Sequence, residues 1–542
     1  MTAYAASVAA VRRREWLVSG LLAGLAATLL VVVGPAGGDV PAHLYRTLLV
    51  RENVYLWDNL WFAGQYPLAS YSLLYYPVAA VVGNLVLVVG SVIASAVLFE
   101  RICSREWGAA AVWPSRAFAV LAAGPLFTGT YSYAAGFATL LATLAALQSG
   151  RISVAVGCAA LTLGFSPLAF VFLVLVLAAV VVSRRSIGRQ AALFAVGLTV
   201  VAGVELVALR LFPTGGRYPF RGFELATVLV VAGIGFVIAS RAAKGGVLAG
   251  LFGFWLLASV ALFLIPEPVG ENVTRLRSVV FPLMLLTVLL ARFRPRQLAM
   301  LGLALALAYN IAPYAPAVAS RMDGRAADEL FWAPALDYLR AHGTRDYRVE
   351  VVPTADHWEA YWLPSAGFAL ARGWYRQLDI AENRVLYRDP LAQVGYRRWL
   401  RRMAVRYVLL PEIRLGKKGA SREARLLLAG VPGLKLVFHT RDWRIYELQN
   451  PKPLLTGPGA ATITAFKHDR IAARVTEPGT YRLAVRYMPY WKVKAGAVCV
   501  APASDGMTLL RARRPGILRL ATDDGPSSLV RSPLRSSGDG CS

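Results

Sequence analysis

The sequence predicts a polytopic α-helical membrane protein with an extracytoplasmic α/β domain and a C-terminal β-sandwich. Its composition is the first reason: apolar residues make up 57% of the 542 residues, charged residues 16%, and the mean hydropathy is +0.51. A soluble chain has about 45–50% apolar and about 25% charged residues. The second reason is that apolar runs of span length fill residues 1–319, and the third is that short strand-like and helix-like segments fill the rest. Together these observations exclude a disordered chain, a coiled coil and an ordinary cytosolic enzyme.

The first span is the apolar run from Trp16 to Val33, which follows the arginines at positions 12–14. It resembles a signal sequence but is long enough to stay in the membrane as an anchor. Ten further runs bring the total to about eleven spans, near residues 77–97, 109–128, 130–149, 152–164, 167–182, 190–212, 224–241, 246–265, 278–291 and 297–313. Several are shorter than the roughly 20 residues that a straight helix needs to cross a bilayer, so tight hairpins are expected over 109–149 and 152–182.

The basic residues of the loops predict the orientation. With the N-terminus in the cytoplasm, 15 loop Lys and Arg residues face the cytoplasm and 7 face outward. This bias agrees with the positive-inside rule. An odd number of spans then places the chain from about residue 315 outside. We therefore expect a multi-pass protein of the bacterial plasma membrane, because the Arg-, Ala-, Val- and Gly-rich composition suits a GC-rich bacterial genome.

The net charge of +27 is spread along the chain. Residues 1–319 carry 22 basic and 10 acidic residues, and residues 320–542 carry 36 and 21. Since no single basic block dominates, we expect the excess to serve cytoplasmic loops and contact with anionic lipid, and we expect no nucleic-acid partner.

Motifs of several other protein classes are absent from the sequence. The four cysteines are scattered without a CxxC pair, so neither a metal site nor a disulfide framework is predicted, and one bridge, Cys499–Cys541, is left open. No GxSxG, Walker or GxGxxG motif occurs. The sequence thus gives no support to a serine hydrolase, an NTPase or a dinucleotide-binding enzyme.

The chain after residue 320 changes character. Over 320–449, strand-like segments alternate with helix-like ones, which predicts a small α/β domain. The expected strands are 347–353, 406–411, 434–440 and 443–448, and the expected helices are 334–341 and 390–403. Short strands with turns over 450–524 predict a β-sandwich that could bind carbohydrate, and the Ser/Gly/Pro-rich tail 525–542 is expected to be disordered.

The first outer loop, residues 34–76, carries the clearest candidate for chemistry. It is too long for a plain connector. Asp39 follows two glycines at the outer end of the first span, and His43 lies four residues on, so on a helix the two would share a face. A carboxylate at the membrane surface can act as a general base toward a hydroxyl that arrives from outside. The alternative is a helix-capping aspartate in a structural loop.

Two pairs of arginines in other outer loops are candidates for binding phosphate. Arg217 and Arg221 follow the seventh span, and Arg275 and Arg277 follow the ninth. Guanidinium groups bind phosphate through two parallel hydrogen bonds, and such groups act where charge develops in a transition state. The alternative is that these side chains contact lipid head groups.

Three further residues are weaker candidates. Glu205 lies toward the outer end of the seventh span, where it could be a second acid of the site or pair with Arg210. His357 and Trp358 lie in an aromatic segment that could contact an acceptor glycan or pack a soluble domain onto the membrane surface. No set of ligands predicts a metal site, and use of a divalent cation is left open.

The motifs of the first loop carry a resemblance to a known family. The pattern G-D-x-x-x-H-x-Y-R is formed by Gly38, Asp39, His43, Tyr45 and Arg46. With the later W-x-x-G-x-Y-P (residues 61–67) and Y-Y-P (75–77), it resembles membrane proteins of the GT-C glycosyltransferase superfamily. The closest branch is labelled as related to 6-pyruvoyl-tetrahydropterin synthase and is similar to actinobacterial arabinofuranosyltransferases. Segments 372–379, 383–387, 406–410 and 487–492 look similar to the same branch.

The resemblance implies an inverting transferase that moves a sugar from a polyprenyl-phosphate donor to an extracytoplasmic glycan or lipid acceptor in cell-wall synthesis. Asp39 would be the catalytic base. Substrate binding would fall to the remaining candidates, namely His43, Tyr45, Arg46, Glu205, Arg217, Arg221, Arg275, Arg277, His357 and Trp358. Two alternatives are a transporter or flippase of a lipid-linked sugar, which needs charged groups across the membrane interior, and a non-catalytic assembly protein that binds envelope glycan.

Overall fold

The computed structural model describes residues 14–34, 36–67, 71–184, 189–212, 216–265, 267–322, 324–416 and 418–525. Arg12, Arg13 and the tail 526–542, which was expected to be disordered, lie outside these ranges. The chain divides into two compact units. Unit 1 comprises Met1–Val40, Tyr71–Ala208 and Arg217–Arg321, and unit 2 comprises Pro41–Ser70, Leu209–Gly216 and Met322–Ser542.

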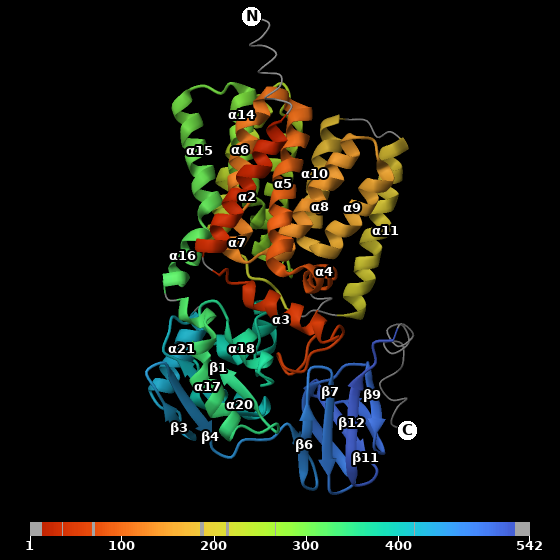
Figure 1. Ribbon diagram of the computed structural model, residues 1–542, viewed down its shortest axis with the longest axis vertical. Helices are drawn as coiled ribbons and strands as arrows, with labels where there is room; N and C mark the ends of the chain where they lie inside the picture. Colours follow the sequence, from red (N-terminus) through yellow and green to blue (C-terminus); the bar gives the residue numbers. More distant parts are fainter. Residues whose placement is uncertain are drawn as a thin grey trace, which may run out of the picture. The chain divides into compact units, whose positions relative to one another are not determined.

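Unit 1 is built of helices (Figure 1). Their bounds are α2 Glu15–Val33, α4 Tyr75–Val82, α5 Asn84–Trp107, α6 Val112–Leu121, α7 Gly124–Thr128, α8 Tyr131–Gln148, α9 Ile152–Phe165, α10 Pro167–Arg184, α11 Arg189–Leu211, α12 Gly222–Ser240, α13 Gly246–Leu264, α14 Val280–Ala291, α15 Arg296–Ile311 and α16 Tyr314–Met322. Two 3₁₀ segments, η1 Gly108–Ala111 and η2 Gly270–Val279, join them. A bundle of this kind satisfies its backbone hydrogen bonds within each helix, as a membrane span must.

Within the described residues, six helical segments are long and apolar enough to cross a membrane. They are Glu15–Val33, Asn84–Thr128, Pro167–Arg184, Gly222–Ser240, Gly246–Leu264 and Gly270–Ala291. The pattern of exposure on α2 supports this interpretation. The small residues Ala23 and Ala27 are buried, while Leu21, Leu25 and Leu29 are at least 60% exposed. Small residues inside and large apolar residues outside are typical of a lipid-facing helix. These helices are consistent with the expected membrane protein, while the count of eleven spans stays a prediction.

One expected span differs in its boundaries. The apolar run 77–97 is divided at Gly83, which has a φ of 90°, into the short α4 and the long α5. A left-handed backbone ends a helix and is open mainly to glycine. Helix α5 then continues to Trp107, about ten residues beyond the expected end, because hydropathy does not register the charged last turn of a helix.

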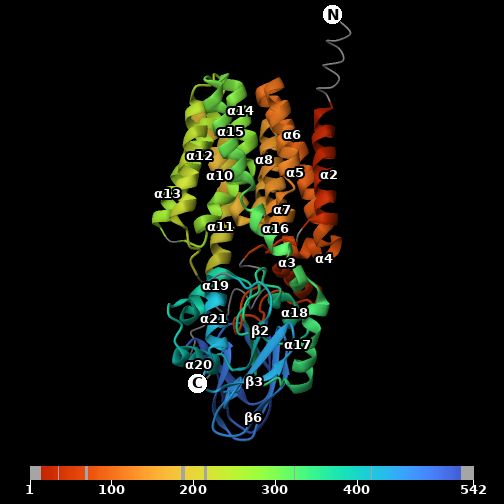
Figure 2. The same cartoon turned by 90° about the vertical axis from the view of Figure 1, so that its left-hand side faces the viewer.

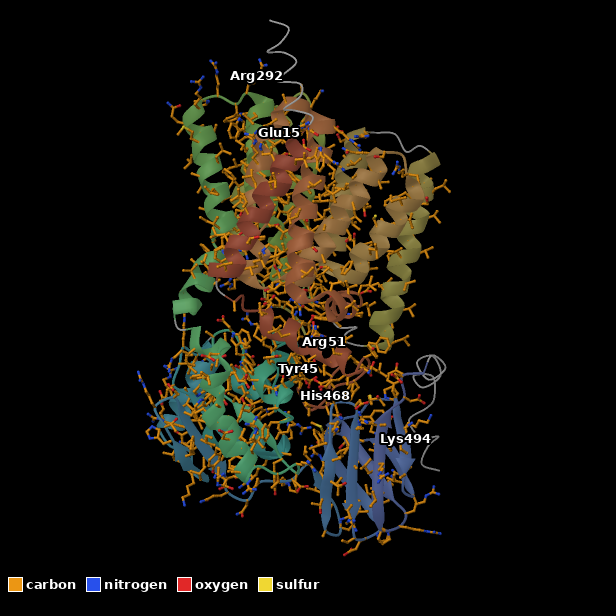
Figure 3. The ribbon with its side chains drawn as sticks, viewed as in Figure 1. Glu15, Tyr45, Arg51, Arg292, His468 and Lys494 are labelled. Carbon is orange, nitrogen blue, oxygen red and sulfur yellow. The ribbon has the colours of Figure 1, made fainter. Side chains whose placement is uncertain are left out.

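The helices of unit 1 form two neighbouring groups. Helix α5 packs on α2, α6 and α8, and α13 packs on α10 and α12. Figure 2 shows α2, α5 and α6 on one side of this unit and α12 and α13 on the other. Glu15 and Arg292 lie at the same end of the unit (Figure 3), where Arg116 donates hydrogen bonds of 2.6 and 3.1 Å to the buried Glu15 carboxylate. The opposite ends of the helices hold the candidate site described below.

Unit 2 contains a mixed sheet flanked by helices. The strand order is β1-β2-β4-β3, with β1 parallel to β2 and the other pairs antiparallel. The strands are β1 Arg348–Val351, β2 Val405–Pro411, β3 Leu434–His439 and β4 Trp443–Leu448. The helices are α17 Glu329–His342, α18 Glu359–Ser365, α19 Arg376–Glu382, α20 Gln393–Arg402 and α21 Lys418–Leu428, with short 3₁₀ turns η3 Gly324–Ala327 and η4 Arg384–Tyr387. All four expected strands and both expected helices are confirmed.

Two four-stranded sheets follow, with strand orders β10-β11-β8-β5 and β6-β7-β12-β9. The strands are β5 Leu455–Thr456, β6 Ala461–Phe466, β7 Arg470–Val475, β8 Gly479–Arg486, β9 Trp491–Ala495, β10 Val498–Pro502, β11 Met507–Ala512 and β12 Gly516–Thr522. Alternate residues of both sheets, such as Leu483 and Leu520, fill one shared core, as in a sandwich. Cys499 on β10 is disulfide-bonded, whereas Cys103 and Cys158 are free; Cys541 lies outside the described residues.

The segment Pro41–Ser70, which the sequence places with the membrane spans, belongs to unit 2. It contains α3, Val40–Arg51. Asn59 donates a hydrogen bond of 2.8 Å to the carbonyl of Lys467, and Trp61 donates one of 3.0 Å to that of Ala360. Trp57 joins a small core with Met488 and Tyr490. The aromatic side chains of this loop are therefore anchored in unit 2.

Candidate functional site

Asp39 is positioned by close contact between two backbone segments of unit 1. A Cβ at Gly37 would lie 2.1 Å from the backbone nitrogen of Gly129, and Gly129 has a φ of 75°. The amide of Asp39 donates a hydrogen bond of 3.4 Å to the carbonyl of Thr128, at the end of α7. Asp39 lies in a turn and α3 begins only at Val40, so Asp39 and His43 do not lie on one helix, the condition under which they would share a face. The close backbone contact between Gly37 and Gly129 therefore fixes the position of the Asp39 backbone, from which the side chain extends.

The Asp39 carboxylate forms an ion pair with Arg275. The Oδ2 and Nη2 atoms are 3.5 Å apart, and the two side chains are 19% and 26% exposed. Arg275 also donates a hydrogen bond to Tyr71 and lies close to Tyr133 and Tyr218. A charge-assisted hydrogen bond is normally about 2.7–2.9 Å long. The contact is thus longer than a direct hydrogen bond, and the Oδ2 atom is buried although each side chain is partly exposed.

Arg277 extends this group of charges. Its Nη1 atom lies 3.5 Å from Oε2 of Glu224 at the start of α12, and its guanidinium lies 5.6 Å from the centre of the Tyr309 ring. The side-chain amide of Asn310 donates a hydrogen bond of 2.9 Å to the backbone carbonyl of Arg277 and so holds the backbone of Arg277 in place. We call Asp39, Tyr71, Tyr133, Arg275 and Arg277 the Asp39 cluster. Its two guanidinium groups and one carboxylate come from two distant parts of the sequence.

Arg221 differs from Arg275 and Arg277 because it is already neutralised. It donates hydrogen bonds of 2.9 and 2.8 Å to the two carboxylate oxygens of Glu271, and one of 3.0 Å to Glu224. The pKa of Arg221 is raised, chiefly by the hydrogen bond to Glu271. A bidentate pair of this kind is the strong form of the interaction. Arg221 therefore has less capacity to bind a phosphate than Arg275 does.

Two other candidates of unit 1 form no ion pair with the cluster among the described residues. The side chain of Arg217 is exposed in the segment before α12. Glu205 lies half-buried on α11, and among the described residues it forms no ion pair, so the expected pairing with Arg210 is not observed.

His43, Tyr45 and Arg46 lie on α3 in unit 2, and all three are at most 1% exposed. The Arg46 guanidinium lies 5.9 Å from the Trp61 ring and 5.7 Å from the Tyr375 ring. Cation–π contacts of this kind stabilise the folded protein by about 0.5–2 kcal/mol when they are shielded from water. In this arrangement Arg46 packs the first loop within unit 2.

Tyr45 belongs to a buried hydrogen-bonded triad that the sequence did not predict. Its hydroxyl donates a hydrogen bond of 3.0 Å to Asp58 and lies 3.2 Å from Nδ1 of His468, and His468 lies 3.0 Å from the other Asp58 oxygen. Figure 3 shows Tyr45 and His468 close together. Burial and the Asp58 carboxylate raise the pKa of Tyr45, so its hydroxyl stays a neutral donor. The triad joins the first loop to the turn between β6 and β7.

We expect this triad to make unit 2 more stable at low pH. Burial lowers the pKa of His468, but its hydrogen bond to Asp58, with the charges of Asp58, Glu52 and Asp469, outweighs burial, and the net pKa is raised. The stabilisation is complete below about pH 6.5, the unfolded value, and is lost as pH rises through the folded pKa. At pH 5.5, His468→Gln should weaken hydrogen-exchange protection of residues 41–67 by about 1–3 kcal/mol, and by much less at pH 9.

The control for this prediction is His439→Gln, since His439 is exposed on β3. That variant should match the wild type at both pH values. A loss of protection in His468→Gln that is equal at pH 5.5 and pH 9 would show that the charge of His468 has no part in holding the loop.

His357 and Trp358 lie immediately before α18. His357 has a φ of 57°, an unusual conformation for a residue other than glycine. Its Nδ1 atom lies 3.0 Å from Glu359, whose other oxygen accepts a hydrogen bond of 2.7 Å from Thr354. The Trp358 ring is buried and stacks against Trp362 at 6.4 Å. The histidine is therefore held with its ring partly exposed beside an aromatic pair.

Sequence reasoning missed several members of the Asp39 cluster. Tyr71 and Tyr133 gave no signal, because tyrosine is common at membrane interfaces, and Glu224, which contacts Arg277, was not among the candidates. No group of three or more His, Cys, Asp or Glu side chains able to hold a metal ion occurs in the part of the chain that the structure describes.

Comparison with known proteins identifies no relative. No family model matches the chain, and no protein of curated function is significantly similar to it. The resemblance to GT-C glycosyltransferases therefore stays a hypothesis that rests on the first-loop motifs.

Proposed function

We propose that the protein is an inverting GT-C-type glycosyltransferase that moves a sugar from a polyprenyl-phosphate donor to a hydroxyl of a glycan or lipid acceptor. In this proposal the chain crosses the bacterial plasma membrane about eleven times, with the N-terminus in the cytoplasm and unit 2 outside. The observation that carries the proposal is the loose ion pair between Asp39 and Arg275. It brings a partly exposed carboxylate and a phosphate-binding group within 3.5 Å of each other.

The reaction needs a base and a group that accepts developing negative charge. The acceptor oxygen attacks the anomeric carbon from the face opposite the phosphate, and its proton passes to the Asp39 carboxylate. The bond between the anomeric carbon and the phosphate oxygen breaks, and polyprenyl phosphate leaves with the bonding electrons. Arg275 and Arg277 stabilise the charge that grows on that phosphate. Inversion follows because a single displacement occurs.

In this proposal Arg275 exchanges one partner, the Asp39 carboxylate, for another, the donor phosphate. Before the donor binds, each group neutralises the other. The donor phosphate is a diester with one negative charge, and its two non-bridging oxygens offer the geometry that a guanidinium binds with two hydrogen bonds. Donor binding therefore draws Arg275 toward the phosphate, and the Asp39 carboxylate then accepts the proton of the acceptor hydroxyl.

Arg275→Ala should lower kcat/KM for the lipid-linked donor by about 10²–10³-fold in purified protein reconstituted in liposomes, since a clamp residue acts on the transition state. The matched control is Arg221→Ala. It removes the same charge from unit 1, but from a guanidinium that Glu271 already neutralises, so transfer should fall less than about fivefold.

Equal losses in the two variants would contradict the assignment of Arg275 to the donor phosphate. Movement of lipid-linked sugar across the liposome membrane without a new glycosidic bond would favour the transporter alternative. Binding of envelope glycan with no transfer, unchanged by Arg275→Ala, would favour the assembly protein.

A further inference from the structure

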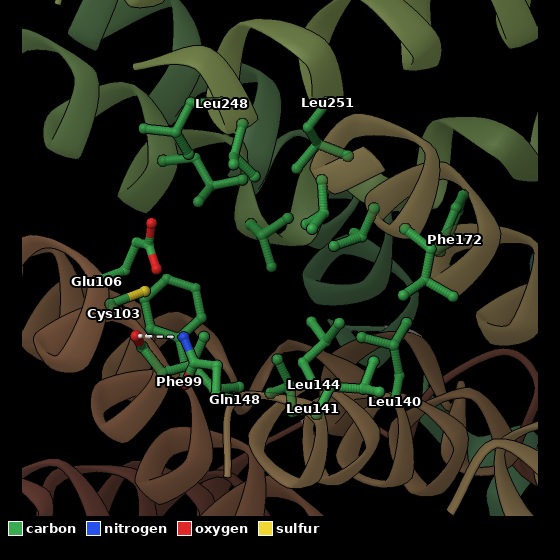
Figure 4. Close-up of a pocket in the computed structure, with 18 of the residues that line it drawn as sticks. Phe99, Cys103, Glu106, Leu140, Leu141, Leu144, Gln148, Phe172, Leu248 and Leu251 are labelled. Atoms are coloured by element: carbon green, nitrogen blue, oxygen red, sulfur yellow. Dashed lines mark hydrogen bonds between the residues drawn. The ribbon is translucent and has the colours of Figure 1, made fainter. Parts of the chain in front are cut away.

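An apolar cavity of about 210 Å³ lies inside unit 1, and its lining includes Leu276, which stands between Arg275 and Arg277 in the sequence. Its walls come from α5, α8, α10, α13 and α14, and Figure 4 shows Leu140, Leu144, Phe172 and Leu251 turned toward it. An empty apolar void of this size forfeits van der Waals contacts along its whole lining. It also offers too few polar partners to hold ordered water. An alkyl chain is the occupant that matches its walls.

The polar residues of the lining gather at one end of the cavity. Glu106, Gln148 and Arg184 come from the last turns of α5, α8 and α10. Arg184 donates a hydrogen bond of 3.1 Å to Glu106, and the two side chains are 57% and 35% exposed. Further exposed basic residues surround this end: Arg105 bonds to Ser149 after α8, and the carbonyl of Lys244 accepts a hydrogen bond from Trp107. This end is basic, and its ion pair is weak enough to exchange.

We propose that this cavity binds one acyl chain of an anionic phospholipid whose head-group phosphate displaces Glu106 from Arg184. A phosphate gains two hydrogen bonds from a guanidinium where the exposed carboxylate holds one. The basic end attracts the anionic head group, and the apolar walls take the chain. The site is separate from the proposed transferase site and does not rest on it.

The geometry distinguishes this site from a site for the sugar donor. Tyr133 on α8 lies close to Arg275, and Gln148 on the same helix lies at the basic end of the cavity. These two residues are about 22 Å apart along the helix axis. A phosphate held by Arg275 and Arg277 therefore lies far from Arg184. The donor could use the cavity only by inserting its chain from the side of Leu276, with no phosphate at Arg184.

The test is native mass spectrometry of the full chain with phosphatidylglycerol, and with phosphatidylcholine of the same chains as the lipid control. We expect one retained phosphatidylglycerol per chain. Arg184→Ala should weaken its retention about fivefold, as expected for one surface arginine. Glu106→Gln should strengthen retention by a similar factor, because the competing carboxylate is gone. Arg292→Ala, which removes an exposed arginine that does not line the cavity, should leave retention unchanged.

Cys103 provides a second measurement, because its free thiol lines the cavity. Phosphatidylglycerol should slow alkylation of Cys103 in the wild type, and phosphatidylcholine should slow it less. Equal retention by Arg184→Ala and Arg292→Ala would overturn the proposal. Displacement of phosphatidylglycerol by polyprenyl phosphate in a manner that depends on Arg275 would also overturn it, since the cavity would then hold the donor chain.

Discussion

Asp39→Asn is expected to reduce sugar transfer by about 10²–10⁴-fold, the usual contribution of a general base. The amide has the shape of the carboxylate but cannot accept the proton of the acceptor hydroxyl at neutral pH. The backbone contacts that place residue 39 are unaffected, because they come from Gly37, Gly129 and the carbonyl of Thr128. The loss should therefore appear in kcat with the fold intact. Transfer by purified protein in liposomes, with donor and acceptor both saturating, measures it.

The matched control is Glu271→Gln, which removes a carboxylate from the same end of unit 1. Glu271 binds Arg221 and has no proposed role in proton transfer, so this variant should keep most of the activity. Size-exclusion behaviour and thermal unfolding of both variants should match the wild type. An Asp39→Asn protein with more than about a tenth of the wild-type rate would remove Asp39 from the role of base.

The elements of unit 2 were largely predictable because each carries a local signal. The strands β2 and β4 alternate or concentrate β-branched and aromatic residues between turn residues, and the structure forms them within a residue or two of the expected bounds. The membrane class was equally accessible, since composition alone excludes a soluble core of this size. Local patterns therefore predicted the kinds of element and their order.

The candidate site was only partly predictable because its members come from distant segments. Asp39 and Arg275 were both singled out, but nothing in the sequence indicates that they pair or that Glu271 neutralises Arg221. The first loop was also ambiguous. Its tyrosines and tryptophans suit a membrane interface as well as a protein core, and only the packing of Trp57 and Trp61 places it in unit 2.

The largest expected effect on stability concerns a buried charge cluster in unit 2. Arg372 is 9% exposed and contacts three buried carboxylates. It forms ion pairs of 2.6 Å with Asp379, 3.1 Å with Glu423 and 3.4 Å with Glu350. Tyr387 also donates a hydrogen bond to Asp379, and Tyr396 donates one of 2.7 Å to Glu423. One guanidinium therefore holds together side chains from β1, α19 and α21.

The protonation of this cluster explains how three acids share one cation. Burial and the neighbouring Glu423 raise the pKa of Glu350 well above its usual value, so we infer that Glu350 holds a proton. Burial opposes ionisation of Asp379 too, but Arg372 and the hydrogen bonds from Tyr387 and Asn383 outweigh it and lower the pKa of Asp379. Asp379 is therefore the charged partner of Arg372, and no other basic side chain of the described ranges forms an ion pair with it.

Arg372→Met is expected to destabilise unit 2 by about 3–5 kcal/mol, because it leaves a charge buried without a partner. Native-state hydrogen exchange of the full chain in detergent should show the amides of β1 and β2 exchanging roughly 10²–10³ times faster. Arg340→Met is the matched control, since Arg340 and Asp337 form an exposed pair on α17, and such pairs contribute at most about 1 kcal/mol.

A second substitution separates the loss of charge balance from the loss of packing. Asp379→Asn in the Arg372→Met background removes the uncompensated charge while keeping the shape of the side chain, so it should recover protection of β1. Adding Glu423→Gln should recover more. If Arg372→Met exchanges no faster than Arg340→Met, or if the added neutral side chains recover nothing, the three carboxylates do not depend on Arg372 for their burial, and the join between β1, α19 and α21 is held by apolar packing alone.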